Sequence, residues 1–136
     1  MLLATGLAWL AIDVFARARA DGFGPHPLAH SILAAHGAIA MVASLAYGGI
    51  VAVHVPRAWA VKRNRWTGCL VATVLAVLMV TAWLLYYASS EDVHAVASLC
   101  HWIVGVAVAL VLPLHVVMGR RARRLEPRIS VAFPTD

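Results

Sequence analysis

Charged residues are scarce in this sequence, and three long runs have none. Charged residues make up 12% of the chain and apolar residues 62%, against about a quarter and about a half in average soluble domains. No Asp, Glu, Lys or Arg occurs in the runs 22–56, 66–90 and 93–119. Each run is longer than the about 20 residues that a helix needs to cross the hydrocarbon core of a bilayer. These gaps exclude a disordered chain, a nucleic-acid-binding module and an ordinary soluble enzyme, and they predict three membrane-spanning helices.

Short motifs of several common cofactor sites are also missing. The two cysteines, Cys69 and Cys100, form neither a CxxC nor a CxxCH pattern, so we expect neither a zinc ribbon nor a covalently attached c-type haem. The sequence has no glycine fingerprint for dinucleotides, no P-loop and no catalytic-triad context. Both cysteines fall in or beside apolar runs, and we expect them to be buried as small apolar side chains.

The runs predict an all-α fold, an integral membrane four-helix bundle that forms a single membrane domain over residues 1–136. We expect helices over about 2–16, 28–55, 66–88 and 93–118, followed by a basic tail over 120–136. Pro56 is expected to end the second helix, because proline has no N–H to donate. The first segment is short for a span. A signal peptide is the alternative there, although the segment lacks the positive charge with which such peptides open.

Basic residues predict the orientation of the bundle. Nine of the eleven Lys and Arg residues lie in the loop 57–65 and in the tail. Two helices separate these segments, so both lie on one side, which the positive-inside rule predicts to be cytoplasmic. Both termini are then cytoplasmic. The net charge of +5 is thereby explained by topology, with membrane lipid as the surroundings and no nucleic acid as a partner.

Histidines are the unusual feature of the predicted spans. His36 and His54 lie on the second helix, and His101 and His115 lie on the fourth. Ionisable residues inside a membrane are costly and usually functional. Helical geometry puts the first pair on one face about 27 Å apart, and the second near one face about 21 Å apart. Because the two helices run parallel, His36 meets His101 at an outer level and His54 meets His115 at an inner level. The mismatch of about 6 Å has to be absorbed by tilt or by a bend at Pro113.

Two facing imidazoles can supply both axial ligands of a haem iron. The two levels therefore predict two b-type haems, with all four histidines as iron ligands. Gly105 and Gly119 each follow a histidine of the fourth helix by four residues, where a small residue admits a cofactor or a neighbouring backbone. Ordinary helix packing is the alternative for these glycines.

Other residues near the two levels have weaker claims. Arg57 and Arg120 flank the inner level, together with Arg63 and Arg65. They are candidate partners of the haem propionates, and topology and lipid headgroups are the alternative explanation. Near the outer level we expect solvated or capping roles for His26 and His30, and a non-ligand role for His94.

These residues together resemble a known family. The stretches GPHPLAHSILAAHGAIAMVASLAYGGIVAVHVPRAW, KRNRWTG, TAWLLYYASSED and LCHWIVGVAVALVLPLHVVMGRR resemble the small bacterial di-haem cytochromes b of the b-561 type. The resemblance covers about residues 24–121. It implies a four-helix bundle in the bacterial inner membrane, with two haems b held by paired histidines. It also implies electron transfer between quinol or a reductase and a partner redox protein. The departure is the interval between His36 and His54, which is longer than the 13 or 14 residues usual in larger cytochromes b.

The sequence thus predicts a transmembrane electron-transfer cytochrome, or a subunit of an oxidoreductase, rather than a stand-alone enzyme. One alternative is a metal-handling membrane protein that uses His26, His30 and His36 near the outer face. Another is a non-catalytic anchor or assembly subunit of a redox complex. Haem content distinguishes the first alternative, and co-purifying proteins distinguish the second.

Overall fold

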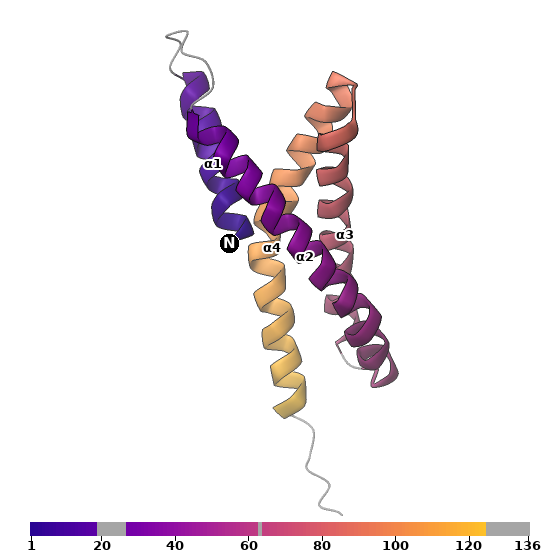
Figure 1. Ribbon diagram of the computed structural model, residues 1–136. Coiled ribbons are helices and arrows are strands. Elements are labelled where there is room, and N and C mark those ends of the chain that lie inside the picture. The colour runs from indigo at the N-terminus through magenta and orange to yellow at the C-terminus, as the bar shows by residue number, and fades with distance from the viewer. Residues whose placement is uncertain (19–26, 63, 125–136) are drawn as a thin grey trace, which may run out of the picture.

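The computed structural model describes residues 1–18, 27–62 and 64–124, which form four helices (Figure 1). The tail beyond residue 124, His26 and Arg63 lie outside the described residues. The helices are α1 (Leu2–Ala18), α2 (Pro27–Ala60), α3 (Arg65–Tyr87) and α4 (Glu91–Arg124). The last three are long and apolar enough to span a membrane, and α1 is a shorter apolar helix. The predicted all-α helical bundle is confirmed.

The helices follow each other around the bundle in chain order. α1 packs beside α2, α2 beside α3, α3 beside α4, and α4 closes the ring against α1. Over the described helices, no Cα atom of α2 comes within 8 Å of one of α4. Directly packed helices have axes about 8–10 Å apart. The helices that carry the four histidines therefore face each other diagonally across the interior, and Figure 1 shows α2 crossing obliquely in front of α4.

Most apolar side chains of the bundle face outward. Of the described residues, only Ala97 and Thr81 are buried, whereas Leu45 is 80% exposed and Leu110 is 75% exposed. Soluble monomers rarely expose contiguous apolar surface on this scale, but hydrocarbon solvates it well. The prediction that the cysteines are buried is wrong, because Cys69 and Cys100 are both exposed. A thiol is apolar enough for the lipid-facing side of a helix as well as for a protein core.

Two helices extend past their predicted ends. α2 continues through Pro56 to Ala60 instead of stopping at the proline. Proline removes one hydrogen bond there, and the backbone still bonds onward from Val61 N–H to the Arg57 carbonyl at 3.2 Å. Similarly, α4 contains Pro113 and runs to Arg124, six residues beyond the predicted end at Met118. A single missing bond in a long apolar helix costs less than exposing the following turns to lipid.

The opposite ends of the bundle differ in charge. α4 begins with Glu91 and Asp92, and the Val93 N–H points to the hydroxyl of Ser90 at 3.5 Å, as expected for a capped N-terminus. The far end holds the basic α2–α3 turn and the arginines that end α4 (Figure 1). In that turn Lys62 and Asn64 have positive φ angles of 55° and 51°, which reverse the chain within four residues of the end of α2.

Candidate functional site

The outer pair of histidines meets across the bundle interior. The ring centroids of His36 and His101 are 6.3 Å apart, and the ring planes are inclined at 81°. Two imidazoles on opposite sides of one metal ion, with bonds of about 2 Å each, have centroids about 6 Å apart. Because α2 and α4 are not in backbone contact, the rings themselves bridge the interior. The separation therefore suits one iron between the two rings.

Each ring of the outer pair is held by a threonine of the neighbouring helix. Thr5 Oγ1 on α1 lies 2.9 Å from His36 Nδ1, and Thr81 Oγ1 on α3 lies 2.9 Å from His101 Nδ1. The single hydroxyl hydrogen of each threonine is directed at backbone carbonyls of its own helix, at 3.0 Å to Leu2 and 2.9 Å to Val77. The hydroxyl oxygen is therefore left to accept a hydrogen bond from Nδ1–H.

The assigned hydrogen bond leaves one ring nitrogen for a metal. An imidazole that carries its proton on Nδ1 has a free lone pair on Nε2. Metal-ligating histidines almost always donate their other N–H in this way, which fixes the tautomer and the ring orientation. Both outer histidines are thus prepared to offer Nε2 to a metal.

At the inner level His115 is held in the same way. Thr67 Oγ1 lies 2.9 Å from His115 Nδ1 and donates to Asn64 Oδ1 at 2.6 Å, so its oxygen is assigned as the acceptor of Nδ1–H. The Asn64 amide also donates to the His115 carbonyl at 3.2 Å. The α2–α3 turn is therefore tied to α4 at this histidine, and His115 Nε2 stays available.

His54 is the exception among the four. It is exposed and lies within electrostatic range of His115. Within residues 1–18, 27–62 and 64–124, no hydrogen bond reaches its ring. Thr5 of α1 pairs with His36, and α1 begins at Leu2, so the part of α2 that carries His54 lies beyond the α1 contact.

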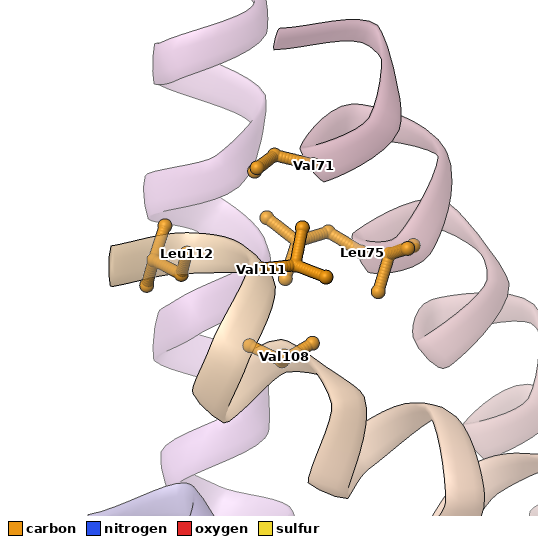
Figure 2. A pocket seen from close by; sticks show the side chains of 6 residues that line it. Val71, Leu75, Val108, Val111 and Leu112 are labelled. Carbon is orange, nitrogen blue, oxygen red and sulfur yellow. The ribbon is translucent and has the colours of Figure 1, made fainter. Parts of the chain in front are cut away.

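A dry apolar layer separates the two levels between α3 and α4. Figure 2 shows Val71 and Leu75 of α3 facing Val108, Val111 and Leu112 of α4. The void among them is about 10 Å³, which is at the lower limit for one water molecule, and its walls are apolar. The walls of this void offer a water molecule almost no polar partner between the histidine levels on the α3–α4 side.

The glycines that lie against histidines are not the predicted ones. A Cβ added to Gly6 would lie 3.3 Å from His36 Cε1, and one added to Gly68 would lie 3.6 Å from His115 Cε1. At Gly105 and Gly119 the nearest atoms belong to α3 or to the turn before it, Leu78 Cδ2 at 3.9 Å and Asn64 Nδ2 at 3.5 Å. The structure thus places Gly105 and Gly119 at helix packing contacts, and their role toward a cofactor stays a prediction.

The sequence analysis did not identify the threonines and glycines that contact the histidine rings, although two sequence patterns mark them. Thr67 and Thr81 are fourteen residues apart, the same interval as between His101 and His115, so antiparallel α3 and α4 bring each threonine beside one histidine. In addition, Thr-Gly occurs twice, at 5–6 and 67–68. Each time the threonine holds a histidine and the glycine leaves room for its ring.

The predicted propionate partners lie at the basic end. Arg57 in the last turn of α2 and Arg120 on α4 are both exposed. Arg65 stacks on Trp59, with its guanidinium carbon 4.7 Å from the ring centroid, and donates to the Trp59 carbonyl at 2.7 Å. The buried Nε of Arg65 has no hydrogen-bond partner among the described residues.

The metal-handling alternative used His26, His30 and His36, and it stays a prediction because His26 lies outside the described residues. His30 and His94 are exposed. Among the described residues, no group of three or more His, Cys, Asp or Glu side chains is placed to hold a metal ion. Pairs of histidines suit haem iron better than a bare ion, because the porphyrin already supplies four nitrogen ligands.

Comparison with protein-family models, with curated proteins and with solved structures found no match. The case for a function therefore depends on the geometry of the site and on the sequence pattern that led to it.

Proposed function

We propose that the protein carries electrons across a membrane through two b-type haems, each held by two histidines. His36 and His101 would hold the outer haem, and His54 and His115 the inner one. The observation that carries the proposal is the outer pair, with ring centroids 6.3 Å apart and both Nδ1 atoms within 2.9 Å of threonine oxygens. The resemblance to small bacterial cytochromes b of the b-561 type points the same way.

The bound haem supplies one-electron chemistry. The protein's own residues would bind the iron, exclude water and supply positive charge. With two imidazoles on each iron, no coordination position would stay open for oxygen activation. The apolar layer around Val108 keeps water out between the levels, and the basic end offers cations, Arg57 and Arg120 among them, to the propionates.

The proposed setting is the bacterial inner membrane, with both termini cytoplasmic because the basic end faces the cytoplasm. Quinol or a reductase would donate electrons on one side, and a partner redox protein would exchange them on the other. The protein would act alone as a cytochrome or as a haem-bearing subunit of a larger oxidoreductase. A single chain that transfers electrons without co-purifying proteins would exclude a purely anchoring role.

Electron transfer across a bilayer tests this proposal directly. Purified haem-loaded protein is reconstituted into liposomes that enclose ferricyanide, with dithionite added outside and valinomycin present to balance charge. We expect the enclosed ferricyanide to be reduced, by one electron for each ferricyanide ion, much faster than in protein-free liposomes. The matched controls are His101→Ala, which should be slow, and His94→Ala on the same helix, which should equal the wild type. A wild-type rate equal to that of protein-free liposomes would overturn the proposal.

A further inference from the structure

The hydroxyl groups that hold the histidines are unevenly distributed between the two levels. Both outer histidines contact a threonine, Thr5 for His36 and Thr81 for His101. At the inner level Thr67 holds His115. No hydrogen bond from the described residues holds His54.

We propose that Thr5, Thr67 and Thr81 are positioning residues that hold the Nδ1–H of the haem ligands and present Nε2 to iron. We further propose that the inner haem site is the weaker one, because none of the described residues makes such a contact with His54. This inference rests on the proposed function, because it assigns roles to residues that act on haem ligands. None of the three threonines would itself touch the iron.

The geometry supports the role at each threonine. The hydroxyl oxygen lies 2.9 Å from Nδ1 in all three cases, and its hydrogen is directed at another acceptor, such as the Val77 carbonyl for Thr81. With its hydrogen used there, the oxygen is assigned as the acceptor of the ring Nδ1–H. Thr81 is one of the two buried residues of the described chain, so water cannot easily replace it.

Two measurable properties should follow from this contact. A ring held in one orientation and tautomer binds metal more tightly, and loss of such an outer contact typically costs 10–100-fold in metal affinity. A ring that donates Nδ1–H is also a more basic ligand, which favours ferric over ferrous iron. Removing the acceptor should therefore raise the midpoint potential, by about 59 mV for each tenfold change in the ratio of ferric to ferrous affinity.

The uneven distribution predicts an order of binding. With both ligands already held, the outer site should take the first haem, and the inner site should fill second because His54 has to be ordered by the haem itself. A titration of haem-free protein with haem should therefore show two affinities. Thr67→Val should weaken the second, and Thr81→Val should weaken the first.

The test compares Thr81→Val with Thr73→Val in the full-length protein. Valine has the shape of threonine without the hydroxyl, and Thr73 is an exposed threonine on the same helix. Haem affinity is measured by titration of haem-free protein, and midpoint potentials by redox titration of the absorbance. We expect Thr81→Val to bind the outer haem 10–100-fold more weakly and to raise its midpoint potential, whereas Thr73→Val matches the wild type. Thr81→Ser should restore both values, since serine keeps the hydroxyl.

The outcomes separate this inference from the proposed function. If wild-type protein binds no haem, the proposed function fails. If the wild type binds haem but Thr81→Val matches Thr73→Val in both affinity and potential, the positioning role is overturned while the proposed function stands. Should Thr81→Val fail to fold, Thr5→Val at the less buried partner of His36 gives the same readout. Two equal haem affinities in the wild type would overturn the predicted order of binding.

Discussion

The two histidine levels differ in how firmly their imidazole rings are held by the rest of the protein. At the outer level both rings are half-buried, face each other across the interior and are fixed by threonines of two different helices. At the inner level His115 is fixed by Thr67 and Asn64, while His54 is exposed. Histidines on the same two helices therefore differ in whether a hydrogen bond to a threonine fixes the ring.

The orientation of the histidine rings is set by the neighbouring helices α1 and α3, rather than by α2 and α4, which carry the histidines. α2 and α4 supply the rings, but α1 and α3 supply the hydroxyls and the glycines that set where the rings point. α3 packs along α4 past both levels, whereas α1 reaches α2 beside His36. The difference between the levels is thus a difference in which helices surround them.

The largest effect is expected from removing an outer ligand. His36→Ala or His101→Ala should lower the haem content from two to about one per chain, because each variant removes a ring that a threonine already holds. His94→Ala is the matched control and should keep both haems. Haem content is measured by the pyridine haemochrome assay. Two haems retained in His101→Ala would break the assignment of the outer level.

The next effect distinguishes the two inner histidines. His115→Ala should lose the inner haem, since it removes the held ligand. His54→Ala should retain a fraction of that haem on His115 alone, with an open coordination position. Carbon monoxide added to reduced protein should then bind in His54→Ala and not in the wild type. Equal haem loss in both variants, with no carbon monoxide binding, would argue against the contrast between His115 and His54.

A smaller effect is expected from the glycines beside the rings. Gly6→Ala places a methyl group 3.3 Å from His36 Cε1, so the ring must move by a few tenths of an ångström. We expect haem affinity at the outer level to fall several-fold, with a weaker effect of Gly68→Ala at 3.6 Å from His115.

Gly37→Ala is the control for both glycine variants, because its added Cβ has nothing within 4 Å. It should leave haem affinity unchanged. Haem titration of the three variants measures whether the loss of haem affinity decreases from Gly6→Ala to Gly68→Ala to Gly37→Ala. The account of the glycines is wrong if Gly37→Ala has as large an effect as Gly6→Ala.

The smallest effect is expected at the basic end. Arg57→Gln and Arg120→Gln should each lower the midpoint potential of the inner haem slightly, since a nearby cation favours the ferrous state. Both side chains are exposed, so screening by salt should reduce the shift. Redox titrations at low and high salt measure it. An equal shift of the outer haem would show that these arginines act through overall charge and do not contact the inner propionates.

The sequence was sufficient to predict the helices and the meeting of the outer pair. Charge-free runs predict long apolar helices from bilayer thickness alone, and helical geometry places His36 level with His101. The helix ends were less predictable. Pro56 was expected to end the second helix, but α2 continues through it to Ala60, because an apolar environment favours continued helical hydrogen bonding on both sides of a proline.

The partners of the histidines could not be predicted from residue type alone. Threonine on an apolar helix commonly bonds to its own backbone, and Thr81 does so here while also holding His101. Its role depends on the register between α3 and α4, which packing decides. In the same way, Gly105 and Gly119 have the right spacing from histidines of their own helix, but spacing within one helix does not tell which neighbour they face.

Haem stoichiometry of the purified wild-type protein tests the central claim most directly. The protein is produced with haem available, purified in detergent and assayed by pyridine haemochrome against protein concentration. The account predicts two b haems per chain, with the first bound more tightly. A folded, helical protein that contains no b haem would contradict it.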